Sequence, residues 1–265
     1  MQLDQLLAHA AQQQDINIPE TWGQGRALFG GLVAGLMVAH AEQRVNDADK
    51  VLRSAFVSFI GPVAPGIASL NAQVLRTGKS VTSIQVQLLQ EGQVQSVLVA
   101  SFGKARESMI DLPGSHAAPV FKAPEHCQPL PFIPGMTPEF FQHFDALWAE
   151  GQMPFTAAKQ PDFGGWMRLK PTEQVANINL PHLFVLGDMW PPAVLPMYNR
   201  VAPASSLSWN LELIQLPPQA SGDSWWQYQV KTEFAADGYA YTQAKIWDAQ
   251  GKLVALSRQT VTVFI

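Results

Sequence analysis

An internal repeat constrains the fold of this chain more than any other feature of its sequence. Residues 74–103 and 233–264 each contain a glycine turn, a stretch that alternates apolar and polar residues, a second glycine turn and a final apolar stretch. The turns are Thr77-Gly78 and Gln90-Glu91-Gly92 in the first copy, and Asp237-Gly238 and Ala249-Gln250-Gly251 in the second. Such alternation between glycine turns is typical of antiparallel hairpins, so we expect two similar antiparallel sheets.

An apolar helical segment precedes each of the two hairpin regions. The first, Gly30–Arg44, is apolar on nearly every face until Glu42, and the second covers about 181–198. A helix that is apolar all round is buried by other structure. Gly31 and Gly35 lie one turn apart and would let the helix backbone approach a sheet or a ligand closely. The order of helix then antiparallel strands, occurring twice, predicts an α+β protein of two fused units.

The boundaries of these units follow from a change in composition between them. Residues 106–160 are rich in proline and read as a connector with one helix, Pro138–Glu150. We therefore expect an N-terminal unit at 1–105, a connector at 106–160 and a C-terminal unit at 161–265.

Composition and charge limit the classes of partner. Apolar residues make up 47% of the chain, which can supply a core, and the net charge of -4 gives no reason to expect nucleic acid or an anionic membrane. The N-terminus lacks the basic start and apolar run of a signal peptide, and the longest apolar run, Leu28–Ala39, is too short to span a bilayer. The single cysteine, Cys127, forms no intrachain disulfide. A cytoplasmic protein without a membrane partner fits these features.

Several short motifs, in a fixed order, resemble one family. They are Gly25–Gly35 with the pattern G-R-x-x-F-G-G-x-x-x-G, then Ser54–Phe59, Leu75–Ser80, Ala100–Phe102 and Trp166–Arg168. Together they resemble the acyl-CoA thioesterase II (TesB-like) family of the double hotdog superfamily. The resemblance implies a double hotdog fold, in which a central helix is wrapped by a curved antiparallel sheet and the whole unit is duplicated.

The resemblance also implies an activity and a set of site residues. The family hydrolyses acyl-CoA to free acid and CoA, without a cofactor or metal, using an Asp, a Thr and a Gln that bind the attacking water. By position these are Asp188, Ser206 and Gln259, with serine in place of threonine. Ser208 stands where the family commonly has a further Asp. An enzyme of fatty acid metabolism, with acyl-CoA as its partner, is the implied function, and assembly into homo-oligomers is left open.

The residues themselves give a chemical reason for this assignment. Asp188 is the one charged residue in the stretch 183–196, and a poorly solvated carboxylate is a stronger base. Unpaired backbone N–H groups at the start of the first helix, at Gly30 and Gly31, are candidates to bind an oxyanion. The family fold would bring these glycines to Asp188. Trp190 is a candidate to line an acyl tunnel.

Each candidate has a structural alternative. Asp188 could cap a helix that begins at Met189, Gln259 could point into solvent, and Gly30 and Gly31 could serve packing only. Cys127 beside His126 is a weaker nucleophile candidate, and the sequence has no zinc-protease or paired-cysteine metal motif. Two other functions stay open, namely a hotdog hydratase or dehydratase, which usually pairs an Asp with a His, and an acyl-binding protein without turnover.

Overall fold

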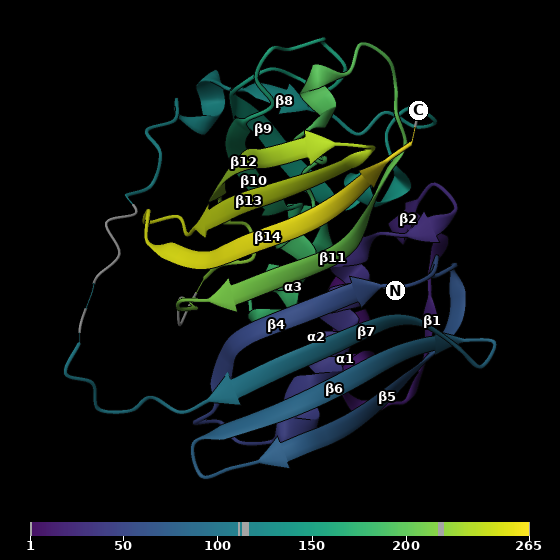
Figure 1. The fold of residues 1–265 in the computed structure, drawn as a ribbon, viewed down its shortest axis with the longest axis vertical. Coiled ribbons are helices and arrows are strands. Elements are labelled where there is room, and N and C mark those ends of the chain that lie inside the picture. Colours follow the sequence, from purple (N-terminus) through teal and green to yellow (C-terminus); the bar gives the residue numbers. More distant parts are fainter. Residues whose placement is uncertain (1, 111, 113–116, 217–219, 265) are drawn as a thin grey trace.

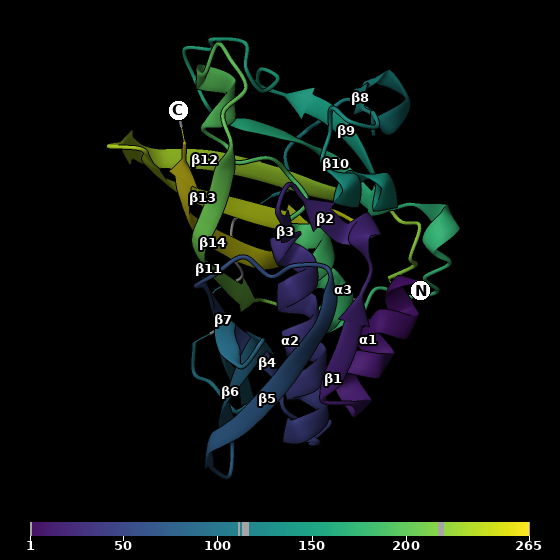
Figure 2. The same cartoon turned by 90° about the vertical axis from the view of Figure 1, so that its right-hand side faces the viewer.

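A single curved antiparallel sheet forms most of the molecule. The computed structural model describes residues 2–110, 112, 117–216 and 220–264. In that part of the chain, twelve strands pair in the order β1-β5-β6-β7-β4-β11-β14-β13-β12-β10-β9-β8. The helices all lie on one side of this sheet (Figures 1 and 2). The predicted α+β class and double hotdog architecture are confirmed.

The two halves of the chain occupy the two halves of the sheet. The first half contributes β1 (Asp15–Ile18), β4 (Val51–Phe59), β5 (Gly66–Thr77), β6 (Val81–Gln90) and β7 (Gln93–Gly103). The second contributes β8 (Gln128–Leu130), β9 (Phe144–Glu150), β10 (Phe163–Leu169), β11 (Ala204–Leu213), β12 (Trp226–Ala236), β13 (Tyr239–Trp247) and β14 (Leu253–Val263). Pairing of β4 with β11 joins the halves, and a small separate hairpin is formed by β2 (Gly23–Gln24) and β3 (Ala27–Leu28).

The glycine turns of the sequence repeat lie between strands, as predicted. Glu91 and Gly92 join β6 to β7 with φ values of 52° and 75°, and Asp237 and Gly238 join β12 to β13 with 55° and 79°. Two successive positive φ values are the geometry of two-residue hairpin turns that suit the twist of paired strands.

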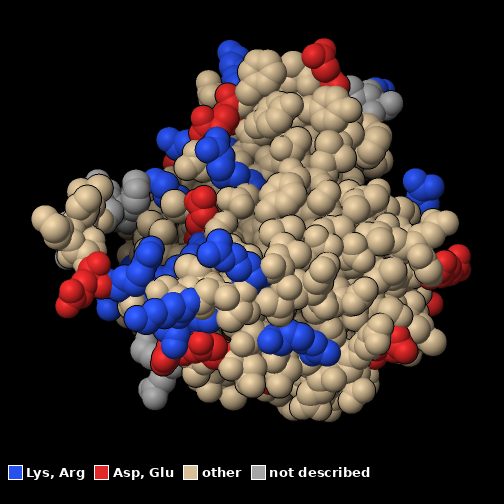
Figure 3. Space-filling model, turned by 60° about the horizontal axis from the view of Figure 1, so that its bottom comes forward, with Lys and Arg blue, Asp and Glu red and all other residues tan. Residues whose placement is uncertain are grey.

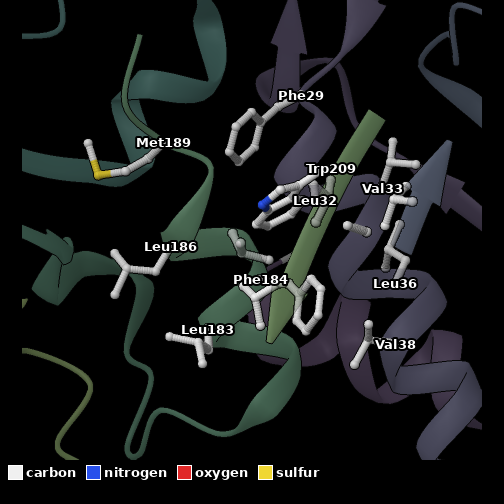
Figure 4. Close-up of a cluster of buried hydrophobic side chains, with 14 of the residues drawn as sticks. Phe29, Leu32, Val33, Leu36, Val38, Leu183, Phe184, Leu186, Met189 and Trp209 are labelled. Atoms are coloured by element: carbon white, nitrogen blue, oxygen red, sulfur yellow. The ribbon is translucent and has the colours of Figure 1, made fainter. Parts of the chain in front are cut away.

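The helices pack together against the inner face of the sheet. They are α1 (Leu3–Gln12), α2 (Gly30–Val45) and α3 (Leu180–Gly187). The first apolar helix is confirmed as α2, which is buried from Gly31 to Ala41. Figure 4 shows apolar side chains of α2 and α3 on either side of Trp209 from β11. No helix among the described residues is both long and apolar enough to cross a membrane.

The second predicted helix is shorter than the sequence suggested. The apolar stretch 181–198 was expected to be helical, but α3 ends at Gly187 and only a 3-10 turn follows, at Leu195–Met197. Pro191 and Pro192 cannot continue an α-helix, and the residue before a proline is disfavoured in it. Asp188 therefore follows α3 directly instead of lying within a long helix.

The predicted helix at Pro138–Glu150 is wrong. A 3-10 helix covers Glu139–His143, and Phe144–Glu150 forms β9. Along β9 buried and half-buried residues alternate, which is the period of a strand. β8 and β9 thus place part of the segment 106–160 in the sheet beside β10. The division of the chain at 105 and 160 stays a prediction.

The contact between α2 and α3 generates a prediction about stability. A Cβ atom at Gly35 would lie 2.7 Å from Val185 Cγ2 and 3.0 Å from the Pro181 carbonyl oxygen. We expect Gly35→Ala to lower the free energy of unfolding by about 1–3 kcal/mol, because overpacking outweighs the gain of about 1 kcal/mol in helix propensity. Urea unfolding measures it, with exposed Gln43→Ala as control. A more stable Gly35→Ala protein would contradict this close packing.

Candidate active site

Asp188 lies where the end of α3 meets the beginning of α2. The Asn179 side chain accepts a hydrogen bond from the His182 backbone N–H, which fixes the start of α3 and thereby the position of its end. A Cβ atom added to Gly30 would lie 3.0 Å from Asp188 Oδ2, and one at Gly31 would lie 2.9 Å from Asp188 Cβ. Only glycines at these positions allow the carboxyl group to approach the helix so closely.

A chain of hydrogen bonds links the three residues selected from the sequence. Gln259 Nε2, on β14, donates to Asp188 Oδ1 at 2.6 Å. Ser206 Oγ, on β11, donates to Gln259 Oε1 at 3.0 Å. Residues 71 and 53 positions apart in the chain thus form one connected group. Gln259 does not point into solvent, because its amide bonds to Asp188 and Ser206. Asp188 does not cap a following helix, since no helix begins at Met189.

The register of β11 determines which serine faces this group. A β-bulge at Leu207 separates Ser206, which pairs with Val261, from Ser208, which pairs with Thr260. Ser205 is exposed, whereas Ser206 is half-buried beside Gln259. Of the three serines, Ser206 is the one that bonds to Gln259 among the described residues.

The surroundings of Asp188 favour its protonated form near neutral pH. Burial raises its pKa to about 7, while hydrogen bonds from Gln259 and from the Gly31 backbone N–H act in the opposite direction. As a whole residue Asp188 is half-buried, at the end of α3. Its carboxyl group thus exchanges a proton close to pH 7.

Trp190 belongs to an aromatic cluster beside Asp188. Its ring centroid lies 5.5 Å from that of Trp148, 5.7 Å from that of Phe163 and 5.7 Å from that of Tyr228. Burial, and then the nearby charge of Asp188, raise the pKa of Tyr228, so its hydroxyl stays protonated. Tyr228 has no local signal in the sequence, because it lies on β12 and is separated from Asp188 by forty residues.

The competing nucleophile and acid candidates are engaged elsewhere. His182 Nε2 lies 2.6 Å from Asp4 Oδ1, at the end of α3 opposite to Asp188. Cys127 Sγ donates to the Lys122 carbonyl oxygen, and burial raises the pKa of the thiol, which disfavours the reactive thiolate. No cluster of three or more potential metal ligands is found in the described part of the chain.

Family models match both halves of this sequence. Residues 18–103 match the acyl-CoA thioesterase N-terminal domain, and residues 124–263 match the C-terminal domain. The chain belongs to the acyl-CoA thioesterase family. The TesB-like resemblance is thereby confirmed, and the family implies an acyl-CoA substrate.

Solved structures of the same fold include close matches over the full length. A conserved protein with a hot dog fold from Alicyclobacillus acidocaldarius has a TM-score of 0.82 at 18% identity, covering 98% of both chains. The acyl-CoA thioesterase II TesB2 of Mycobacterium marinum has 0.71 at 19% identity, covering 97% of both. The tesB protein of Mycobacterium avium subs paratuberculosis has 0.72 at 13%, covering 98% of this chain and 99% of the other. No curated protein matches the chain.

The position of Ser206 generates a prediction. Its hydroxyl fixes the orientation of the Gln259 amide, so Ser206→Ala should lose about 1–3 kcal/mol of transition-state stabilisation, or about ten- to a hundredfold in kcat. Ser206→Thr keeps the hydroxyl and should stay active.

Steady-state kinetics with an acyl-CoA measures this, and Ser205→Ala and Ser208→Ala are the matched controls. A large loss at either control together with a silent Ser206→Ala would show that another serine serves the site.

Proposed function

We propose that this protein hydrolyses acyl-CoA thioesters to a free acid and CoA, using a water held by Asp188, Ser206 and Gln259. The observation that carries the proposal is the hydrogen-bonded row of these three side chains at the first turn of α2. Family membership and the hotdog fold support thioesterase activity.

Asp188 serves as the general base in this proposal. A base works best when its pKa is near the operating pH, and burial brings that of Asp188 to about 7. The attacking water binds Oδ2 of Asp188 in this proposal, since Oδ1 accepts the hydrogen bond from Gln259. Ser206 holds Gln259 Oε1, so the amide nitrogen faces Asp188 and its second N–H is available to the water oxygen.

The start of α2 supplies the stabilisation of negative charge. The first intrahelical bond runs from the Val33 N–H to the Phe29 carbonyl, so the N–H groups before Val33 have no partner within the helix. The Gly31 N–H donates to Asp188. We assign the Gly30 N–H to the developing oxyanion, since the positive end of the helix dipole favours negative charge there.

The reaction then proceeds in two steps, addition of water and loss of the CoA thiolate. Asp188 takes a proton from the water as its oxygen bonds to the thioester carbonyl carbon, giving a tetrahedral oxyanion. The oxyanion collapses, the carbon–sulfur bond breaks, and the CoA thiolate takes the proton from Asp188. The carboxyl group of Asp188 is thereby returned to its starting state, without a cofactor.

The aromatic cluster around Trp190 is the proposed wall for the acyl chain. Trp190 follows Asp188 by two residues, and its indole N–H donates to Met167 Sδ, which fixes the ring. Family resemblance carries the expectation of a role in fatty acid metabolism.

Two other functions of hotdog proteins make different demands on the site. A hydratase would need a histidine beside Asp188, but His182 is bound to Asp4 and Asn179 at the far end of α3. An acyl-binding protein without turnover would keep the same pocket. Release of free thiol from acyl-CoA separates hydrolysis from both alternatives.

The first test replaces the base. We expect Asp188→Asn to fold and to lower kcat for acyl-CoA hydrolysis by roughly two to four orders of magnitude, the range typical for a lost general base. A thiol reagent that follows CoA release over a series of acyl chain lengths measures it. Near-normal kcat with saturating substrate would remove Asp188 from the chemistry.

The second test uses pH. A base acts when deprotonated, so kcat/KM should rise with pH through about 7, where Asp188 titrates, and level off above it. The hydrogen bond from Gln259 lowers the pKa of Asp188, so Gln259→Leu should move the midpoint to higher pH. A pH–rate profile of both proteins measures this. A flat wild-type profile between pH 5 and 9, or a midpoint moved to lower pH in Gln259→Leu, would contradict the assignment.

A further inference from the structure

The two halves of the sheet repeat each other down to their irregularities. In the first half, extra residues form β-bulges at Arg53, Leu75 and Gln95. In the second half, bulges occur at Leu207, Glu233 and Val254, in the corresponding strands. Bulges are structural features that define strand register. Three matching bulges therefore relate the halves residue by residue.

This correspondence shows what stands in the first half where the second has its polar site residues. Ser206 precedes the bulge at Leu207, so its counterpart is Leu52, which precedes the bulge at Arg53. Gln259 pairs with Trp209, which lies two residues after the bulge at Leu207. The residue two after the bulge at Arg53 is Ala55, and it pairs with Ala100. Ala100 is therefore the counterpart of Gln259. Two of the three residues that hold the proposed water are thus replaced by aliphatic ones.

A cavity nevertheless lies at this related position. Its volume is about 410 Å³, and its walls include Leu52, Phe102, Leu180 and Leu213. The proposed active site lies between the end of α3 and the start of α2, and this cavity lies between the end of α2, at Val45, and the start of α3, at Leu180. Leu213 is the counterpart of Phe59, which contacts Gly30 at the active site. The cavity thus lies in the first half at the place that corresponds to the proposed active site, and the counterparts of Ser206 and Gln259 there are aliphatic.

The rim of the cavity carries one cation with unused donors. Arg53 Nε donates to the Gly103 carbonyl oxygen at 3.1 Å. In the described part of the chain Arg53 makes no other hydrogen bond or ion pair, so the terminal nitrogens of its guanidinium are free to form a bidentate pair with a carboxylate. Figure 3 shows Lys and Arg gathered toward the left of the lower face, the side on which β4 begins and β7 ends in Figure 1.

The acidic groups at the cavity do not oppose an anion strongly. Asp47 is paired with Lys50 at 3.4 Å and with Lys104 at 3.3 Å. Glu42 is exposed to solvent, which screens its charge, and partial desolvation raises the pKa of its carboxyl group above the usual value. A ligand with a carboxylate at Arg53 and an aliphatic chain along the exposed Val51 and Ile214 matches the remaining surface.

We propose that this cavity is a second, non-hydrolytic site that binds a medium-chain aliphatic carboxylate, with the carboxylate at Arg53 and the chain along the exposed side chains of Val51 and Ile214, which line the cavity together with the buried Leu52, Phe102 and Leu213. The class of ligand rests on the proposed function, because a free acid of this kind is the product of the hydrolysis. The volume lies within the range of about 300–1,000 Å³ typical of small-molecule sites.

The test maps the bound acid directly. An octanoic acid that carries a photoreactive diazirine on its chain is bound to the full-length Asp188→Asn protein, cross-linked by light, and located by mass spectrometry of the peptides. We expect saturable labelling of the segments 42–53 and 213–216, which unlabelled octanoate displaces. Labelling confined to the segments around Gly30 and Asp188 would overturn the proposal.

Arginine variants test the head-group contact in the same protein. Arg53→Gln should weaken labelling of the segments 42–53 and 213–216 by about tenfold or more, the scale of one lost hydrogen bond to a charged group. Arg76→Gln is the matched control, because Arg76 is exposed on β5 and does not line the cavity. Equal labelling of the two variants would contradict the role of Arg53.

Hydrolysis is measured separately on the protein with Asp188 intact. If thiol release fails while the labelling is found, the proposed function is wrong and the second site stands. If thiol release is found without the labelling, the second site alone is wrong.

Discussion

The contact between the carboxyl group of Asp188 and the first turn of α2 is the interaction on which the site depends. It requires two helices from different halves of the chain to pack side by side in opposite directions, and glycines at positions 30 and 31 to let the end of one approach the start of the other. The pairing of β4 with β11 holds the halves in this relation. Burial among apolar groups disfavours the charged carboxylate and raises the pKa of Asp188. The hydrogen bonds from Gln259 and Gly31 partly offset this effect, and the resulting pKa is about 7.

Much of this arrangement could be predicted from the sequence, because its signals are local. Alternating residues between glycine turns define hairpins, and the continuous apolar run from Gly30 defines a buried helix. Asp188 was conspicuous as a lone charge in an apolar stretch. Gln259 and Ser206 had no such signal, since a polar residue on a strand is ordinary; the family resemblance selected them, and the observed hydrogen bonds bring them together with Asp188.

The parts that the sequence did not predict depend on tertiary context. The residues Phe144–Glu150 follow a 3-10 turn and become a strand because β10 offers a partner for pairing. The end of α3 at Gly187 is set by the prolines and by the contact with α2, so its length could not be read from hydrophobicity alone. Tyr228 reaches the site only because the sheet curves around both helices.

The duplicated fold accounts for a cavity in the first half at the place that corresponds to the proposed site in the second. Matching bulges show that the halves share one backbone design, whereas Ser206 and Gln259 correspond to Leu52 and Ala100. The two strand residues of the water-binding group thus have aliphatic counterparts in the first half. The halves have thus kept their packing while differing in chemistry.

The protonation of Asp188 tests the central claim most directly. Carbon-13 NMR of protein labelled at aspartate carboxyl groups, with Asp188→Asn to assign the signal, follows the titration of this one group. The account predicts a midpoint at about pH 7, which moves to higher pH in Gln259→Leu. A midpoint near 4, the ordinary value for an exposed aspartate, would contradict the account, because Asp188 would then be a solvated carboxylate and not a buried base.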